Sequence, residues 1–410
     1  MTDRVRAQYE AHPYPQREPA EEKNRLIIGS PSDVREIDHY LFAGALDWKA
    51  PFKALIAGGG TGDALVMLAQ QLADRGTPAE LHYLDLSEAS GRIAQARIET
   101  RGLAKLVTFH RGSLLDAGKI APGPYDYIDC NGVLHHLDDP ASGLNALAAQ
   151  LAPGGGMGLM VYGELGRTGV YDAQDMLRTL CGGAADSERI ETARALLREL
   201  PASNRLRRNP LVGDHLSGGD AGLYDLLLHS RDRAYRVPEL AALVGGAGLA
   251  VASFIEPSRY DPATYLSDPA LLAKLAGLSA LERAAFAELL AGNMKTHVCY
   301  VAPRARAGAC VARADQPGAV PYGRDVDFPS LALGLANAAP SANFDGLTVK
   351  LKLPHGAAEI LARIDGKTPL GAIHKAAMPG QDWSAFLGQF APVYAAFNGI
   401  NRMLIRRAQG

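Results

Sequence analysis

Cysteine is scarce in this sequence, and the few cysteines are scattered. The four lie far apart and form no CxxC pair: Cys130, Cys181, Cys299 and Cys310. This spacing argues against a structural zinc site and against a disulfide framework, and it is typical of a protein kept in a reducing cytoplasm. We therefore expect a cytoplasmic protein without a metal site.

Long apolar runs and an excess of charge of one sign are also missing. No run of about 18 apolar residues exists, so no transmembrane helix is expected, and the polar, proline-containing N-terminus does not look like a signal peptide. The formal net charge is −2, so the bulk charge gives no reason to expect nucleic acid or an anionic membrane as a partner. Apolar residues make up 47% and charged residues 21%, which describes an ordinary globular protein.

The length and the pattern of the first half predict the fold class. A chain of 410 residues exceeds what one hydrophobic core supports, so two or more domains are expected. Short apolar strands alternate with helix-length segments, which predicts a doubly wound α/β fold with a mostly parallel sheet and helices on both faces. The strands are expected at 54–57, 81–84, 107–110, 125–129 and a stretch ending at Tyr162.

Two insertions are expected to interrupt the second half of this domain. Segments 163–236 and 257–293 are predicted to be helical caps over the sheet. Strands at 249–255 and 296–302 are expected to complete a seven-stranded sheet as an antiparallel hairpin. The domain as a whole would cover 48–303.

Smaller units are expected at both ends of the chain. Residues 1–47 are predicted to be an N-terminal lid segment, in which alternate prolines such as Pro13 and Pro15 exclude a regular helix before a helix at 33–46. Residues 304–335 hold several Pro, Gly and Ala and are expected to be a linker. A small α+β domain would follow at 336–410.

A glycine-rich loop, Gly58-Gly59-Gly60-Thr61-Gly62, follows the first expected strand. Glycine lets the backbone turn sharply there and lets a ligand lie against it without meeting a Cβ atom. The N-terminus of the next helix offers free N–H groups to a carboxylate or a phosphate. A dinucleotide fingerprint would need a third glycine where Asp63 stands, so a nicotinamide-dependent enzyme is disfavoured. A plain glycine-rich turn is the other alternative.

Two more segments should reach the same edge of the sheet. Asp85 ends the second strand, 23 residues past Gly62, where an acidic side chain can accept hydrogen bonds from a ribose diol. It could instead cap the next helix, a role that Ser87 could take equally well. After the fourth strand, His135 and His136 are adjacent and point in different directions, so they are poor joint metal ligands. One could be a general base and the other a packing residue.

These motifs together resemble the class I S-adenosylmethionine (SAM)-dependent methyltransferases, which have a Rossmann-like fold. The resemblance rests on the runs ALIAGGGTGD, YLDLS, YDYIDCNGVLHHLDDP and LAPGGGMGLMVYGELGR, and it is closest to a bacterial subgroup with a GVLHH motif. Tyr9 and the Pro13-Tyr14-Pro15 segment are similar to a stretch that precedes the domain in that subgroup. The resemblance covers about 1–303. It implies methyl transfer from SAM to N or O of a peptide or protein side chain or of a mid-sized metabolite, with S-adenosylhomocysteine as product.

The resemblance also implies the donor site, residue by residue. The glycines of the loop would face the methionine part of SAM, Asp85 the ribose, Ser113 and Leu114 the adenine, and Asn131 the amino or sulfonium end, while Tyr9, Tyr14 and Arg17 would form a lid. The implied cofactor-binding residues are Gly58, Gly60, Thr61, Gly62, Asp85, Leu86, Ser113, Leu114, Asn131 and Tyr14.

Two positions depart from the family pattern. Ile56-Ala57 replaces an acidic residue common before the first glycine, so another group must hold the ammonium of SAM. Ser113 stands where many relatives have an aspartate, so the contact with the adenine amino group is weaker or displaced to a neighbour.

Methyl transfer itself requires few catalytic groups from the protein. The sulfonium is already a good electrophile, so the enzyme mainly aligns the nucleophile, although an amine or a phenol also needs a base. His135, Glu164 and His229 are the candidate bases, each with a structural role or an ion pair as its alternative. A nucleotide-dependent oxidoreductase and a non-catalytic SAM-binding scaffold are the alternative functions.

The C-terminal unit, with Ile364–Ile373 as its most distinctive stretch, is similar to small winged-helix modules that bind peptides beside modifying enzymes. Its arginines Arg402, Arg406 and Arg407 form a basic edge, which is weak evidence for nucleic-acid binding. A role in homodimer formation or as a lid is the alternative.

Overall fold

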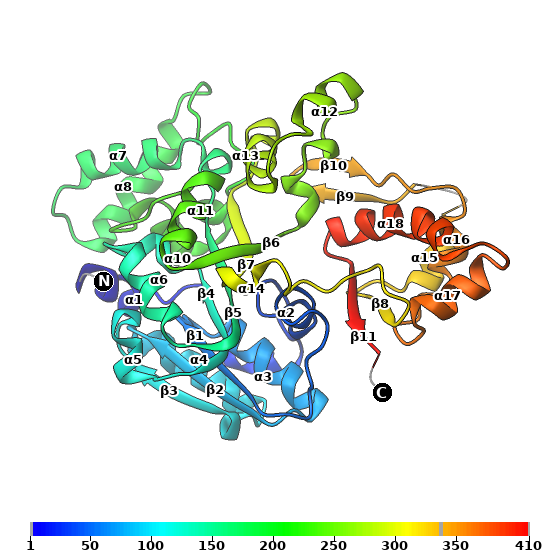
Figure 1. Cartoon of the computed structure of the whole chain (residues 1–410). Helices are drawn as coiled ribbons and strands as arrows, with labels where there is room; N and C mark the ends of the chain where they lie inside the picture. The colour runs from blue at the N-terminus through cyan, green and yellow to red at the C-terminus, as the bar shows by residue number, and fades with distance from the viewer. Residues whose placement is uncertain (1–2, 336–338, 409–410) are drawn as a thin grey trace.

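A seven-stranded sheet forms the centre of the computed structural model, which describes residues 3–335 and 339–408 (Figure 1). The strand order is β3-β2-β1-β4-β5-β7-β6, and only β7 runs antiparallel to its neighbours. The strands are β1 (Phe52–Ala57), β2 (Ala79–Asp85), β3 (Val107–Arg111), β4 (Tyr125–Asn131), β5 (Leu151–Tyr162), β6 (Leu249–Ile255) and β7 (Thr296–Pro303). The predicted doubly wound α/β fold is confirmed.

Helices cover both faces of the sheet because its central strands are apolar on both sides. Along β1, Leu55 and Ala57 join one buried cluster while Ala54 and Ile56 join the other. The first face carries α6 (Pro140–Ala148) and α11 (Val237–Gly246), and the second carries α2 (Val34–Leu41), α3 (Asp63–Arg75) and α4 (Glu88–Thr100). None of the helices built by the described residues has the length and apolar character needed to cross a membrane.

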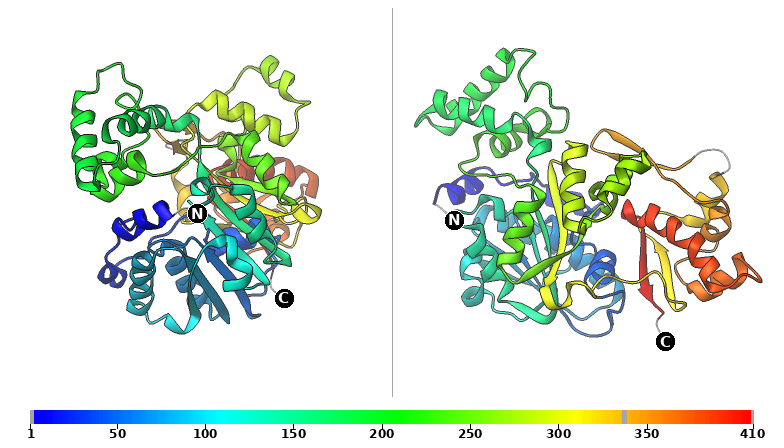
Figure 2. Two further views of the ribbon diagram at one scale, coloured as in Figure 1. Left: turned by 90° about the vertical axis from the view of Figure 1, so that its left-hand side faces the viewer. Right: turned by 45° about the horizontal axis from the view of Figure 1, so that its top comes forward.

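The larger insertion is a helical body with its own apolar core. It contains α7 (Val170–Cys181), α8 (Asp186–Glu199), α9 (Asp214–Ser217), α10 (Gly219–Leu223) and a π-helical turn at 224–228. The smaller insertion carries α12 (Pro269–Leu275) and α13 (Ala280–Ala291). Figure 2 shows the larger body, in green, standing over the N-terminal helix in dark blue.

The N-terminal segment differs from the prediction in two ways. A helix, α1 (Asp3–Ala11), precedes the prolines, because residues 3–11 contain none and Pro13 follows its last turn. Helix α2 stops at Leu41, short of the predicted residue 46, because Ala43 and Gly44 adopt positive φ angles of 54° and 66°.

The expected linker at 304–335 is largely built into the C-terminal unit. Within it, β8 (Ala319–Gly323) pairs antiparallel with β11 (Met403–Arg407), and α15 (Phe328–Gly334) buries Phe328 against Phe397. The short α14 (Arg304–Ala307) lies before them. The sequence did not predict the pairing of β8 with β11, because the proline, glycine and alanine residues there show no alternation of apolar and polar positions. Such small residues can nevertheless pack closely. The predicted boundary at 336 falls on residues 336–338, outside the described part.

The rest of the C-terminal unit consists of a hairpin and three helices. These are β9 (Ser341–Phe344), β10 (Leu347–Lys350), α16 (Ala357–Leu361), α17 (Leu370–Ala377) and α18 (Trp383–Gly399). Strand β9 was not predicted. A separate apolar core lies between these elements and α15.

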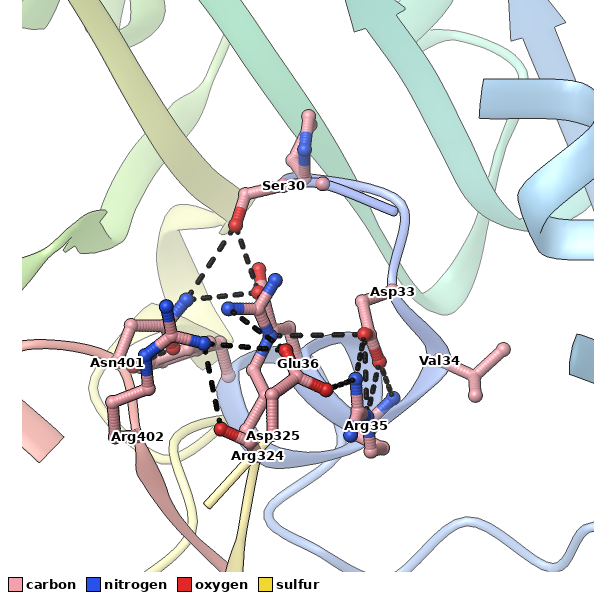
Figure 3. A network of polar contacts seen from close by, with 12 residues as sticks. Ser30, Asp33, Val34, Arg35, Glu36, Arg324, Asp325, Asn401 and Arg402 are labelled. Carbon is pink, nitrogen blue, oxygen red and sulfur yellow. Dashed lines mark hydrogen bonds and ion pairs between the residues drawn. The ribbon is translucent and has the colours of Figure 1, made fainter. Parts of the chain in front are cut away.

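A buried polar network joins this unit to the sheet domain (Figure 3). The Glu36 carboxylate, fully buried on α2, lies 2.7 Å from the Arg324 guanidinium and accepts a hydrogen bond of 2.8 Å from Asn401. It also accepts hydrogen bonds from the hydroxyls of Ser30 and Tyr300. We call this network the joint. Each of its buried charges has partners on the opposite side of the contact between the C-terminal unit and the sheet domain.

Candidate active site

A cavity of about 270 Å³ lies at the carboxyl edge of the parallel strands. Ligands bind at this edge in doubly wound folds because several strand ends and the loops after them converge there. Nine of the ten residues predicted to bind SAM line the cavity, and Ser113 is the exception. Its hydroxyl instead accepts a hydrogen bond of 3.2 Å from the backbone N–H of Leu115, whereas Leu114 reaches the cavity.

The glycine loop needs its glycines for conformation and for space. Gly58 and Gly62 have φ angles of 75° and 97°. A Cβ at Gly58 would lie 2.4 Å from a methyl group of Val133, and one at Gly62 would lie 2.8 Å from the Cβ of Ala94. Without side chains, the loop passes close to its neighbours and leaves its backbone open to the cavity.

Asp85 is held in place by backbone donors. Its carboxylate accepts hydrogen bonds of 2.8 Å from the N–H groups of Gly60 and Ser87, and burial raises its pKa. Ser87 caps α4 by accepting from the N–H of Ser90, so Asp85 does not serve as the cap of this helix. The carboxylate lines the cavity, where its remaining lone pairs can accept from a diol.

Asp63, at the position where a dinucleotide fingerprint has its third glycine, begins α3. Its carboxylate forms an ion pair of 2.6 Å with Arg17 and one of 2.7 Å with Arg97. A carboxylate at this helix N-terminus would repel a phosphate group. The carboxylate of Asp63 therefore argues against a bound dinucleotide. Arg17, which was predicted to be part of a lid, forms an ion pair with this residue at the start of α3.

The N-terminal segment lies against the cavity. The Thr61 hydroxyl donates a hydrogen bond of 2.8 Å to the carbonyl of Pro15, and Tyr14 lines the cavity next to a cis Tyr14-Pro15 bond. Glu10, on α1, accepts hydrogen bonds of 2.7 and 2.9 Å from the N–H groups of Glu88 and Ala89 at the start of α4. Helix α1 is thereby fixed to the edge of the sheet.

Where the larger insertion meets α1, four side chains that line the cavity form what we call the cap cluster: Tyr9, His136, Tyr162 and Asp225. The hydroxyls of Tyr9 and Tyr162 donate to the two carboxylate oxygens of Asp225 at 3.1 and 3.3 Å. Burial raises the pKa of Asp225 to about 6. This part of the cavity therefore combines aromatic rings with a buried carboxylate.

None of the three predicted bases lines the cavity as the described residues form it. Glu164 is exposed and paired with Arg236 at 3.0 Å. His135 is buried with its ring stacked on Tyr162 at 3.8 Å, and neither of its ring nitrogens has a hydrogen-bond partner among the described residues. His229 contacts the cap cluster through Tyr9, whose hydroxyl lies 3.2 Å from its Nε2, and through His136, on whose ring it stacks at 3.9 Å.

His136, which the sequence offered with His135 as a possible base but which was not among the three selected, lines the cavity. Its Nδ1 lies 2.9 Å from the carbonyl oxygen of Arg231 and donates to it, which leaves the Nε2 lone pair unprotonated. Burial lowers the pKa of His136 to about 4, so the ring is neutral at pH 7. Sequence could not separate His136 from His135, because only the 3-10 turn at 134–136 decides which ring faces the cavity.

The side chains of His136, Asp225 and His229 bring ligand atoms within 4.8 Å of one another. In His229, however, Nδ1 accepts a hydrogen bond of 3.0 Å from the N–H of Arg231. Its Nε2 therefore carries the ring proton and donates to Tyr9, whereas a metal ligand needs an unprotonated nitrogen. The arrangement suits a hydrogen-bonded chain from His229 through Tyr9 to Asp225.

Comparisons with known proteins agree on the family. A family model described as a methyltransferase domain matches residues 55–157. An uncharacterized protein of Synechococcus is 33% identical over 299 residues, which are 71% of this chain and 69% of that protein. A ubiquinone biosynthesis O-methyltransferase of Thiobacillus denitrificans is 34% identical over 113 residues, 27% of this chain and 45% of its own length.

Solved structures show the same fold. PKMT2 from Rickettsia typhi has a TM-score of 0.59 at 16% identity, over 89% of this chain and 73% of that one. The same protein in complex with AdoHcy (S-adenosylhomocysteine) has a TM-score of 0.57 at 15% identity, over 87% and 72%. Together with the matching domain, these findings favour SAM over the nicotinamide cofactor of the alternative function. The chain belongs to the family of the Synechococcus protein and is a SAM-dependent methyltransferase with the class I fold.

Proposed function

We propose that the enzyme methylates a nitrogen atom of a peptide or protein side chain or of a mid-sized metabolite. The observation that carries this proposal is the buried Asp225 carboxylate, which lines the cavity between the rings of Tyr9 and Tyr162. A protonated amine is attracted by a buried carboxylate.

The donor would occupy the part of the cavity beside the glycine loop. Gly58, Gly60 and Gly62 would lie along its methionine part, Asp85 would accept from the ribose hydroxyls, and Leu114 would pack on the adenine. Bound there, SAM supplies an electrophilic methyl group. Tyr14, on the N-terminal segment, would help to keep water away from it.

His136 would act as the base in place of His135, Glu164 and His229. An amine attacks only when its lone pair is free, so one proton must leave the ammonium form before transfer. The neutral ring of His136 has an unprotonated Nε2, and the Arg231 carbonyl fixes its orientation. Asp225 would hold the ammonium until that proton has moved.

Oxygen is the second candidate acceptor atom. A phenol needs a neutral base more than it needs a carboxylate, and His136 is such a base. Two of the curated relatives are ubiquinone biosynthesis O-methyltransferases, from Thiobacillus denitrificans and Sodalis glossinidius. A phenol acceptor would depend on His136 and would be largely insensitive to Asp225.

Methyl transfer to separate acceptor panels tests the proposal. Purified enzyme with methyl-labelled SAM is offered peptides and small molecules that carry either primary amines or phenols. We expect label on nitrogen, and we expect Asp225→Asn to lower kcat/KM for the amine by about 10- to 100-fold, the loss typical of a hydrogen bond to a charged group. The affinity for S-adenosylhomocysteine should change less than about twofold, since it does not use this carboxylate.

Asp220→Asn is the matched control, because Asp220 is exposed on the same insertion and pairs with Arg194. It should leave amine methylation unchanged. Label on phenols alone would show that nitrogen is not the acceptor, and amine methylation that survives Asp225→Asn would show that Asp225 does not bind the amine.

A further inference from the structure

The methionine part of SAM carries an ammonium group, and the glycine loop has no acidic residue beside it. Position 56, where an acid would stand two residues before Gly58, is isoleucine. A carboxylate is nevertheless present on the neighbouring strand. Asp129 of β4 is the register partner of Ile56 of β1. Paired positions on adjacent parallel strands lie about 4.8 Å apart with their side chains on the same face.

Asp129 reaches the cavity although it is almost completely buried. Its side chain lines the cavity together with Ile56 and Gly58, and only 2% of the residue is exposed. The Ser32 hydroxyl donates a hydrogen bond of 2.5 Å to Oδ2. A backbone hydrogen bond from Asn131 also favours the charged form of Asp129. Burial nevertheless raises the pKa of Asp129 to about 6.

Two of the other carboxylates around the cavity are already satisfied, and the third, Asp225, accepts from two tyrosine hydroxyls in the cap cluster. Asp63 is paired with Arg17 and Arg97, and Asp85 is held by backbone N–H groups. By contrast, no lysine, arginine or histidine of the described chain lies within ion-pair distance of Asp129. A buried carboxylate without a cation is costly unless a ligand supplies the positive charge.

We propose that Asp129 binds the α-ammonium group of SAM, one strand away from the position that Ile56 occupies. Ser32 orients the carboxylate through Oδ2, and after the contacts with Ser32 and Asn131 the carboxylate keeps lone pairs for the ammonium of the ligand. The assignment rests on SAM dependence alone and does not depend on which acceptor is methylated.

Binding measured by calorimetry tests this proposal with two ligands. S-adenosylhomocysteine has the amino acid part, whereas 5′-methylthioadenosine has the same adenine, ribose and sulfur without it. For Asp129→Asn we expect the affinity for S-adenosylhomocysteine to fall about 10- to 100-fold, as for the loss of a charge-assisted hydrogen bond. The affinity for 5′-methylthioadenosine should stay within about twofold, because that ligand has no ammonium group.

A second pair of variants tests the role of position 56. In the Asp129→Asn background, Ile56→Glu returns a carboxylate to the same face of the sheet and should recover most of the lost affinity for S-adenosylhomocysteine. Ile56→Gln in that background is the matched control. It should not recover this affinity, since glutamine has the same length as glutamate without the charge. Equal weakening of both ligands by Asp129→Asn, or unchanged binding of S-adenosylhomocysteine, would overturn the proposal. If the unaltered enzyme bound neither ligand, the donor assignment itself would fall.

Discussion

Several buried carboxylates of this enzyme differ mainly in their partners. Asp63 is paired with two arginines, Asp85 is held by backbone N–H groups, and Asp225 receives two tyrosine hydroxyls. The two arginines lower the pKa of Asp63, whereas burial raises the pKa of Asp225, Asp129 and Asp38 to about 6. The residue type alone therefore does not determine the charge state, because the neighbours decide whether desolvation is offset.

Asp38 offers a test of this effect far from the cavity. Its pKa is raised to about 6 in the folded protein, against about 3.9 for an unfolded chain. Between these values the folded state binds more protons, so this residue makes the free energy of unfolding fall as the pH rises from about 4 to 6. In Asp38→Asn we expect that contribution to disappear, with the variant gaining about 2–3 kcal/mol over the unaltered protein between pH 4 and pH 7.

Urea unfolding at both pH values measures the difference. Asparagine can still accept the hydrogen bond of 2.9 Å from the N–H of Leu46, so the substitution removes mainly the titration. A stability difference that is the same at pH 4 and pH 7 would contradict the raised pKa.

At the scale of elements, α1 connects two parts of the molecule across the cavity. Tyr9 reaches Asp225 and His229 in the larger insertion, and the side chain of Gln8 accepts a hydrogen bond of 3.1 Å from the N–H of Ser230. On its other side, Glu10 accepts from the first N–H groups of α4. We therefore propose that α1 is the part of the N-terminal lid that closes over the donor.

Glu10→Gln should loosen this closure. It removes the carboxylate that interacts with the helix N-terminus, an effect of about 0.3–1 kcal/mol. We expect the corresponding two- to fivefold loss of affinity for S-adenosylhomocysteine. We also expect faster hydrogen exchange in α1, measured by mass spectrometry. Glu18→Gln, at an exposed position outside the lining of the cavity, is the control and should change neither quantity. Unaltered exchange in α1 would exclude this role for Glu10.

At the scale of the whole molecule, the C-terminal unit is attached by a buried polar joint. Arg324, which is 7% exposed, lies between Glu36 at 2.7 Å and Asp33 at 3.6 Å. Strand β8, from the expected linker, pairs with β11. A truncation after residue 335 would therefore divide this unit, and point substitutions are the better probe of the joint.

Arg324→Met should destabilise the protein by about 3–5 kcal/mol, because it removes the cation that pairs with the buried Glu36 carboxylate. Arg402→Met is the matched control, since Arg402 is more exposed and pairs with the exposed Asp325 at 3.2 Å, and it should cost at most about 1 kcal/mol. Chemical unfolding of both variants measures these changes. Equal, small effects would mean that the joint contributes little to stability.

The role of the C-terminal unit in binding peptides, its part in dimer formation and the cytoplasmic location stay predictions from the sequence. Binding of acceptor peptides to the intact enzyme, with substitutions on the surface of α17 or α18, would address the first of them.

The sequence by itself determined the sheet, the glycine loop and the donor class, because each depends on local features. Apolar strands buried on both faces need continuous apolar runs, and a loop with positive φ angles needs glycine. The tertiary structure alone decided which histidine reaches the cavity, that 319–335 belongs to the C-terminal unit, and that a carboxylate lies beside Ile56. These depend on a 3-10 turn, on pairing across some 80 residues and on strand register, which bring together positions far apart in the chain.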